Sequence, residues 1–242
     1  MRILVLMLFV LANIAVASIG KITSFKGSVN INRDSQDIRA KLNLDVEKSD
    51  TISTKKNSNV IIKFNDKTII TVGKNSTLTI EEYLFDEKNS ANSQTQFNFL
   101  KGTFKSVTGT IGHINPDKFR LKTKTANIGI RGTVTLGNQK LIACTKGSIS
   151  VKSKSKSVIL NAGEYIDVSE DKAPSNPKKL SAEVLDILYN QLNITIKSDS
   201  DDGSKATGFK AITKAVEKSV TEQEKSDGSS SGGDSGGSGG GH

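Results

Sequence analysis

The sequence is short of the side chains on which most enzymes depend. Among 242 residues it has one cysteine, no tryptophan and two histidines, His113 and His242. A Ser-His-Asp triad would have to use His113, and no Gly-x-Ser-x-Gly segment accompanies it. A zinc or iron site lacks ligands, no Asp-x-Asp-x-Asp loop predicts calcium, and no glycine-rich phosphate loop precedes a helix. We therefore expect no catalytic residue, no metal and no cofactor.

Aromatic residues are also scarce, at 5% of the chain, whereas hydrophobic residues as a whole reach 35%. A core built on aliphatic residues suits a pleated sheet better than a ligand pocket lined by large rings, so no small-molecule substrate is evident. The formal net charge is +9, and its excess is lysine, with 29 lysines against 5 arginines. Proteins that bind nucleic acids rely on arginine contacts and aromatic stacking, so we expect no nucleic-acid partner.

The single cysteine, Cys144, cannot form a disulfide within the chain. It follows Leu141-Ile142-Ala143 in a predicted strand. A free cysteine is among the most buried residue types, which favours a small buried apolar side chain over the alternative of an intermolecular bridge.

Residues 1–17 resemble a signal peptide. Arg2 gives the positive start, residues 3–14 form an apolar run interrupted by Asn13, and Ala15-Val16-Ala17 fits the small-x-small cleavage pattern. The apolar run is shorter than the ~20 residues of a membrane span, which is the alternative reading. We expect cleavage before Ser18 and a periplasmic protein.

Residues 18–170 have the alternation of apolar and polar residues that is typical of strands. We predict an all-β domain, a two-layer antiparallel β-sandwich or β-roll. Residues 65–67 and 153–157 are predicted hairpin turns, and Lys26-Gly27 is predicted to lie near the turn of a hairpin within residues 19–31. Further strands are predicted at 42–46, 59–64, 68–72, 77–80, 96–100, 119–125, 134–136, 140–144, 149–151 and 158–160.

The composition changes after Val168, and residues 171–225 are predicted to form a linker and amphipathic helices. Ser181 is a predicted N-cap, and Leu180 and Leu185 can form a hydrophobic staple at the start of a helix that docks on the sheet. A second helix is predicted at 209–220, with apolar residues on one side and lysines on another. Residues 226–242 are nearly all Gly and Ser and predict a disordered tail.

The most distinctive segment is residues 125–133, where Gly129 and Gly132 flank a single arginine between two predicted strands. Glycine permits a positive φ or a close backbone approach, so we predict a bulge or corner that redirects Arg131. Its guanidinium could bind a partner's carboxylate, or it could bond carbonyl groups at the bend while its stem covers apolar surface. We favour the structural role.

This segment, Thr-x-x-Ala-x-Ile-x-Arg-Gly-Thr, resembles the signature of the FecR domain, and the resemblance extends over residues 20–168. Supporting fragments are Gly27-Ser28-Val29-Asn30-Ile31, Asp50-Thr51-Ile52-Ser53-Thr54, Asn65-Asp66-Lys67-Thr68-Ile69, Leu100-Lys101-Gly102-Thr103, Lys146-Gly147-Ser148-Ile149-Ser150-Val151 and Leu160-Asn161-Ala162-Gly163-Glu164. The family pattern favours glycine where Lys67 stands. The motif residues that the resemblance marks, mainly with structural roles, are Thr125, Ala126, Gly129, Arg131, Gly132, Thr133, Gly147 and Gly163.

The resemblance implies a periplasmic module that binds another envelope protein in signalling or scaffolding. In the family's best-known members, a cytoplasmic anti-sigma region and a transmembrane helix precede this domain. This sequence shows neither, so we expect a free periplasmic protein rather than direct control of a sigma factor. The alternative is a peripheral protein that attaches weakly to an anionic membrane or cell-wall surface through its basic C-terminal helix.

Overall fold

The structure is a computed structural model of the chain, and it describes residues 17–194. Most of the predicted signal peptide, the predicted helix at 209–220 and the Gly/Ser tail lie outside the described residues. None of the helices within residues 17–194 has the length and hydrophobicity that a membrane-spanning helix requires.

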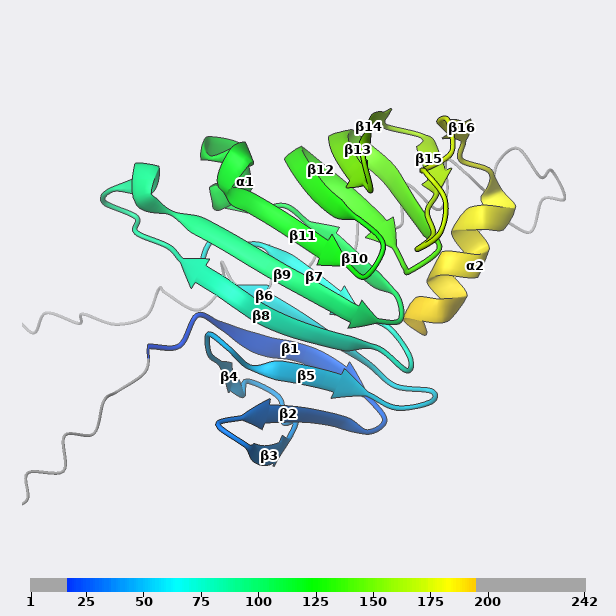
Figure 1. Cartoon of the computed structure of the whole chain (residues 1–242). Helices are drawn as coiled ribbons and strands as arrows, with labels where there is room; N and C mark the ends of the chain where they lie inside the picture. Colours follow the sequence, from blue (N-terminus) through cyan, green and yellow to red (C-terminus); the bar gives the residue numbers. More distant parts are fainter. Residues whose placement is uncertain (1–16, 195–242) are drawn as a thin grey trace, which may run out of the picture.

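The described chain is mostly β-strand, and its strands join in one sheet that curls on itself (Figure 1). The strands of the first half are β1 (Gly20–Lys26), β2 (Val29–Arg33), β3 (Gln36–Arg39), β4 (Asp45–Val46), β5 (Thr51–Thr54), β6 (Asn59–Phe64), β7 (Ile69–Val72) and β8 (Thr77–Leu84). Those of the second half are β9 (Gln94–Lys101), β10 (Phe104–Val107), β11 (Phe119–Thr123), β12 (Asn127–Gly137), β13 (Leu141–Ser153), β14 (Lys156–Asn161), β15 (Glu164–Asp167) and β16 (Lys178–Lys179). The helices are η1 (Ser90–Asn92), α1 (Thr110–Ile114), η2 (Pro116–Lys118) and α2 (Ala182–Leu192).

The all-β prediction is confirmed, and its β-roll form describes the curled sheet better than two separate layers. Neighbouring strands are antiparallel except β9 and β11, which run parallel from the pair Thr95 and Phe119 to the pair Phe99 and Thr123. A parallel pair needs a crossover connection, and here β10, α1 and η2 supply it. The sheet is therefore mixed.

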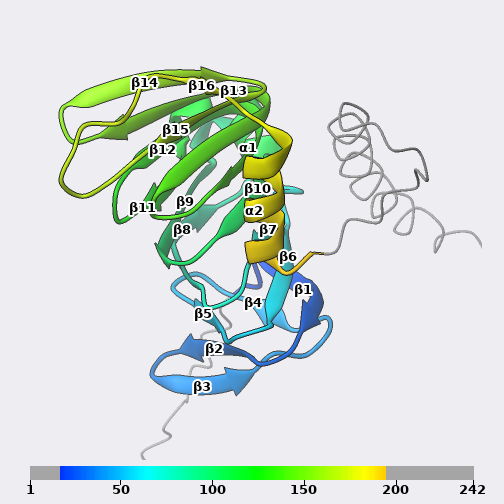
Figure 2. The same cartoon turned by 90° about the vertical axis from the view of Figure 1, so that its right-hand side faces the viewer.

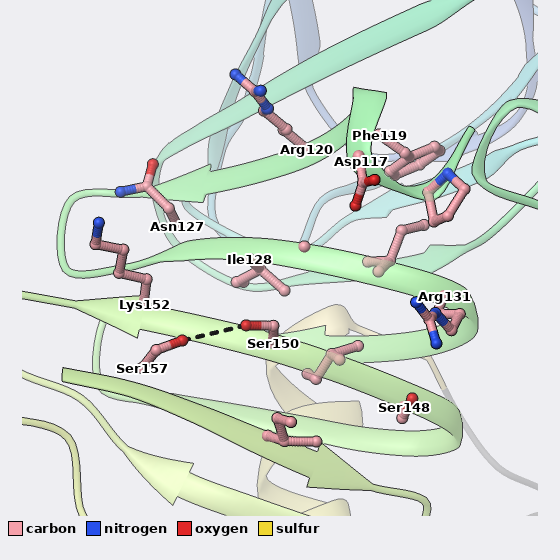
Figure 3. A pocket seen from close by; sticks show the side chains of 15 residues that line it. Asp117, Phe119, Arg120, Asn127, Ile128, Arg131, Ser148, Ser150, Lys152 and Ser157 are labelled. Atoms are coloured by element: carbon pink, nitrogen blue, oxygen red, sulfur yellow. Dashed lines mark hydrogen bonds between the residues drawn. The ribbon is translucent and has the colours of Figure 1, made fainter. Parts of the chain in front are cut away.

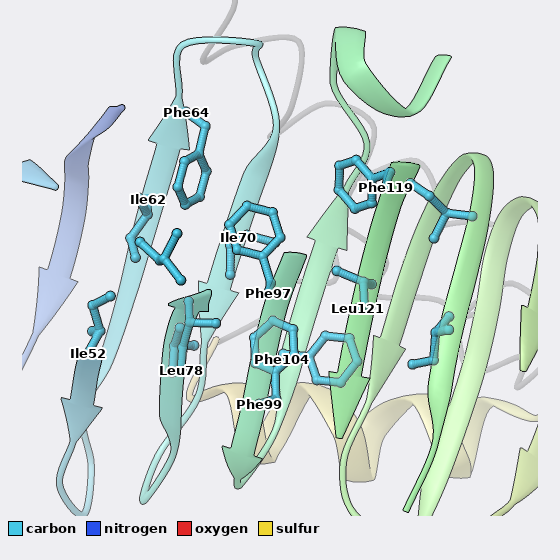
Figure 4. Close-up of a cluster of buried hydrophobic side chains, with 14 of the residues drawn as sticks. Ile52, Ile62, Phe64, Ile70, Leu78, Phe97, Phe99, Phe104, Phe119 and Leu121 are labelled. Atoms are coloured by element: carbon cyan, nitrogen blue, oxygen red, sulfur yellow. The ribbon is translucent and has the colours of Figure 1, made fainter. Parts of the chain in front are cut away.

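The main core lies inside the roll. In β6 alternate residues point inward, and Val60, Ile62 and Phe64 are buried. Five buried phenylalanines from β6, β9, β10 and β11 form its centre (Figure 4); they are Phe64, Phe97, Phe99, Phe104 and Phe119. The rings of Phe99 and Phe104 stack with their centroids 3.9 Å apart. These contacts hold the two sides of the roll together.

Helix α2 lies against the sheet (Figure 2), and a smaller core is formed between the helix and the outer face of the sheet. The predicted helix is confirmed: it begins after Ser181, whose side chain accepts a bond of 3.4 Å from the Val184 amide. Leu180 and Leu185, the predicted staple pair, are both buried in this cluster. The helix residues pack on Val134, Leu136 and Ala143 of β12 and β13. The other members of this cluster are Leu188, Tyr189 and Leu192.

The hairpin of β12 and β13 joins the two sides of the roll. The first part of β12 pairs with β11, and its last four residues pair with β10. Between these parts the register with β13 shifts from Arg131 to Val134. Gly132 has a φ of +60° at this shift, and Gly147 on β13 has a φ of +74°. The predicted bulge at Gly132 is present, and it lets one hairpin bend around the core.

The predicted hairpin within residues 19–31 is wrong. β1 pairs with β4 and β6, whereas β2 pairs with β3 and β5, so the two strands do not pair with each other. At Gly27 the φ is +74°, and the next amide, of Ser28, donates to Ser58 Oγ over 2.9 Å. That bond holds the chain at a corner and directs it to another part of the sheet. Nearby, the strand predicted at 42–46 shrinks to β4, because Asn43 has a φ of +60°.

The hairpin predicted around residues 65–67 is present, since β6 and β7 pair from Val60 with Val72 to Lys63 with Ile69. Lys67 takes a φ of +69°. A lysine therefore adopts the left-handed backbone for which the family pattern favours glycine. The predicted hairpin tip at 153–157 is also present, with Lys154 at a φ of +52° between β13 and β14.

Candidate binding groove

A groove crosses the outer face of β11, β12, β13 and β14, on the side of the roll that α2 does not cover (Figure 3). Its volume is about 480 Å³. We call it the Gly129 groove, and its lining is Pro116, Asp117, Phe119, Arg120, Asn127, Ile128, Gly129, Ile130, Arg131, Ser148, Ile149, Ser150, Lys152, Ser157 and Ile159. It includes part of the motif segment that the sequence singled out.

Strand register places Gly129 at the centre of this groove. Arg120 of β11 and Ser150 of β13 lie directly opposite Gly129, and Ile159 of β14 lies opposite Ser150. Asn127 and Arg131 are two residues away on either side of Gly129 along β12, so their side chains share its face. Ser148 and Lys152 flank Ser150 in the same way on β13. The floor of the groove is therefore the one position of this face without a side chain.

The backbone does not need glycine at position 129, in contrast to the prediction. Its φ is not in the left-handed region, and a Cβ built there would meet one atom within 4 Å, the Ser150 carbonyl oxygen at 4.0 Å. Gly132 differs, because its φ is positive and an added Cβ would lie 2.9 Å from the His113 ring. What glycine provides at 129 is open space between neighbouring side chains.

Three cationic side chains are among the lining residues of the groove. Arg120, Arg131 and Lys152 are exposed, and none of them forms a hydrogen bond or ion pair within residues 17–194. The predicted bonds from Arg131 to carbonyl groups at the bend are thus not formed. Asp117 is the carboxylate among the lining residues. Among the lining residues, positive charge is in excess, and no ion pair within residues 17–194 engages these three cations.

A structural arginine elsewhere in the molecule shows the contrast. Arg33 bonds Asp50 through Nε and Nη2 at 2.8 and 2.7 Å, and it also contacts Glu47. The hydrogen bond to Asp50 raises the pKa of Arg33, while burial opposes that rise. Asp50 is fully buried. The guanidinium of Arg33, which is part of the fold's own structure, thus has carboxylate partners.

The remaining groove side chains are small, polar or apolar. Ser150 Oγ and Ser157 Oγ lie 3.2 Å apart, and Ser148 and Asn127 offer further polar groups. Ile159 is 66% exposed, which makes it the most exposed large hydrophobic residue of the described chain. Within that part of the chain, no three His, Cys, Asp or Glu residues are grouped so that they could hold a metal ion. The chemistry available here is donation of hydrogen bonds beside an apolar contact.

The other motif residues do not line the groove. Ala126 and Thr133 are buried, and Thr133 Oγ1 lies 3.2 Å from Thr108 Oγ1. The Thr125 carbonyl accepts a bond of 2.7 Å from Ser153 Oγ. Gly163 has a φ of +85° in the turn before β15, and its carbonyl accepts a bond from Leu180. These residues, with Gly132 and Gly147, shape the bend and the turns around the groove.

Two lone reactive residues lie elsewhere. Cys144 is fully buried, as predicted, and burial raises the pKa of its thiol to about 11. His113 is exposed on α1, beside Gly132.

Sequence reasoning missed Arg120, Ser150 and Lys152. The alternation in residues 119–125 already placed Arg120 and Lys122 on one face, but Lys122 forms an ion pair with Glu81 and only Arg120 is left for the groove.

Comparison with known proteins supports the motif assignment. Residues 50–150 match the family described as FecR protein. No curated protein shows significant similarity to the chain. Two crystal structures of a candidate anti-sigma factor from Parabacteroides distasonis are similar to it at 13% and 14% identity, with TM-scores of 0.44 and 0.45. Each match covers 56% of this chain and 62% of the other, so it spans less than two thirds of those solved structures.

Proposed function

Residues 50–150 of this chain form a FecR domain, and on this premise we propose that the protein is a non-enzymatic regulator that binds another envelope protein. The partner contacts the Gly129 groove. Binding there contributes to signalling or scaffolding in the periplasm.

The proposal rests on two motif residues of the outer face, Arg131 and Gly129, which have no evident role in holding the fold. Arg131 is exposed, and its side chain has no hydrogen-bond or ion-pair partner within residues 17–194. Gly129, two residues before it, leaves open space that its own backbone does not require. A side chain that serves the fold is packed or bonded, as Thr133 and Arg33 are. Residues that do neither are available to a second molecule.

The lining supports protein binding better than catalysis. Arginine and lysine side chains act as hydrogen-bond donors, and the groove holds no histidine or cysteine among its lining residues. Ile159 beside the serines gives a mixture of apolar and polar contacts that is typical of protein interfaces. We therefore assign the groove a recognition role.

The periplasmic location is part of the proposal and is supported by the sequence alone. Arg2, the apolar run of residues 3–14 and Ala15-Val16-Ala17 have the order of a cleaved signal peptide. Mass spectrometry of a periplasmic extract tests it: a chain beginning at Ser18 is expected, and an intact Met1 in the membrane fraction would contradict it.

Photo-crosslinking in the cells that produce the protein tests the recognition role. A photoreactive amino acid replaces Ile159 in the groove or, as a matched control, Ile187 on the outer surface of α2. Both isoleucines are exposed, at 66% and 55%, so neither replacement disturbs a core.

We expect a discrete protein adduct from position 159 that is absent from position 187 and is lost when Arg131→Glu is added. An adduct from position 187 alone would place recognition on the helix. The absence of an adduct at both positions would reject protein binding by this surface.

A further inference from the structure

We propose that the Gly129 groove recognises an extended acidic segment, whose carboxylates contact Arg131 at one end and Lys152 at the other. This inference rests on the proposed function and specifies the chemistry of the partner. Arg120 provides a third contact from β11, beside the floor.

The spacing of the cations argues for a chain rather than a compact anion. Lys152 lies opposite Asn127, which is four residues before Arg131 on β12. Four residues of a strand span roughly 13 Å. Figure 3 shows Arg131 and Lys152 at opposite ends of the lining, with Arg120 to one side. A single phosphate or carboxylate cannot reach both ends, whereas an extended segment with acidic residues four positions apart can.

The floor between the cations is suited to a polypeptide main chain. Gly129 leaves its own position empty, and Ser148, Ser150 and Ser157 are short side chains around it. The main chain of a bound segment needs this room, because its amide groups and side chains must fit above the sheet. Ile159 adds an apolar contact that a bare polyanion would not use.

Charge sets the sign of the ligand. Three cations face one carboxylate, Asp117, among the lining residues, and the cations have no intramolecular ion pairs within the described chain. The whole chain is also basic, at a formal +9, which speeds the approach of any acidic partner without selecting a site. Selection must come from the position of the cations around Gly129.

The test is a nuclear magnetic resonance titration of the ¹⁵N-labelled chain with a blocked peptide, Glu-Val-Thr-Val-Glu, whose carboxylates are four positions apart. The amides of Gly129 and Ser150 are expected to shift saturably. The matched peptide Gln-Val-Thr-Val-Gln has the same shape without the charges. It is expected to cause no shift of the Gly129 and Ser150 amide resonances.

Variants decide whether the groove or the general charge is responsible. Arg131→Gln and Arg120→Gln should each weaken binding about tenfold, the loss expected for one charge-assisted hydrogen bond. Arg39→Gln removes the same charge from an exposed arginine on β3, at the far end of the strand order, and is expected to change affinity less than twofold. An equal loss in Arg39→Gln and Arg131→Gln would overturn the proposal.

Two further results would also overturn it: equal binding of the Gln peptide, or binding of inorganic phosphate at Gly129 as tight as that of the acidic peptide. These failures are distinct from failure of the proposed function. A crosslinked partner at position 159 without peptide binding would retain recognition and reject its acidic character. Peptide binding without any crosslinked protein would retain the affinity of the groove for acidic segments and reject the proposed protein partner.

Discussion

Gly147 faces Gly132 across the bend of the β12–β13 hairpin, and a Cβ on Gly147 would lie 2.5 Å from the Gly132 carbonyl oxygen. Both glycines have positive φ, at +74° and +60°. The hairpin therefore bends where two backbones approach more closely than any side chain allows. Because β12 crosses from β11 to β10 at this bend, the shape of the roll depends on it.

Gly132→Val is expected to lower the free energy of unfolding by about 3 kcal/mol or more. It combines a β-branched residue at positive φ with a contact to His113. Lys154→Ala at the exposed hairpin tip is the comparison and should change stability by less than about 0.5 kcal/mol. Urea denaturation measures both, and equal midpoints would show that the bend is not constrained.

Lys105→Met is expected to stabilise the protein. Lys105 on β10 is 7% exposed, and burial lowers its pKa from 10.5 to about 8. Below pH 8 the amine is protonated in both the folded and the unfolded state, and burying its charge destabilises the fold by the full amount. This destabilisation decreases between pH 8 and 10.5, and it is absent above pH 10.5, where the amine is neutral in both states. The difference corresponds to about 3 kcal/mol at most. The gain from Lys105→Met should therefore be larger at pH 7 than at pH 10.

Lys101→Met is the control for that comparison, because Lys101 is exposed at the end of β9. Its effect on the free energy of unfolding should be small and the same at both pH values. If the gain from Lys105→Met were also independent of pH, the buried amine would not be the source of the destabilisation.

Asp66→Ala should cost about 3 kcal/mol, because it leaves several buried donors without an acceptor. The buried carboxylate accepts bonds from Thr68 Oγ1 at 2.7 Å, from Tyr83 Oη at 3.1 Å and from the Ile111 amide at 3.3 Å. It thus ties the β6–β7 turn to β8 and α1. Asp37→Ala, at an exposed acid of β3, should cost less than about 0.5 kcal/mol in the same thermal or urea titration.

Cys144 should react with a thiol reagent such as dithionitrobenzoate only when the protein unfolds. Burial raises the pKa of its thiol to about 11, so the reactive thiolate is scarce at pH 8 and also shielded. Since it is the one cysteine of the chain, the rate of colour development reports on this site alone. Fast reaction of the native protein at pH 8 would contradict the buried position.

Local features of the fold could be read from the sequence. The β6–β7 hairpin follows from two alternating runs around Asn65-Asp66-Lys67, and the start of α2 follows from Ser181 between Leu180 and Leu185. Each depends on residues within a few positions of one another. The separation of β1 from β2 could not be read in this way, because it depends on pairing with β6 and β5, far along the chain.

Only part of the candidate site could be predicted from the sequence, because the rest depends on which strands pair. The motif drew attention to Gly129, Arg131 and Gly132, but residue type alone cannot separate a glycine needed by the backbone from one that leaves space. Adding Arg120 and Lys152 to the site requires the registers of β11 and β13 against β12. Register is a tertiary property, so the groove became visible only in the folded chain.

Gly129→Val tests the account most directly, because it separates binding from folding at one position. The backbone there is open to a side chain, so the free energy of unfolding from urea denaturation should stay within about 0.5 kcal/mol of that of the original protein. A valine on the floor should nevertheless block the groove and abolish the shifts that Glu-Val-Thr-Val-Glu causes at Ser150. Unchanged stability with lost binding is the predicted result, and unchanged binding of the peptide would contradict it.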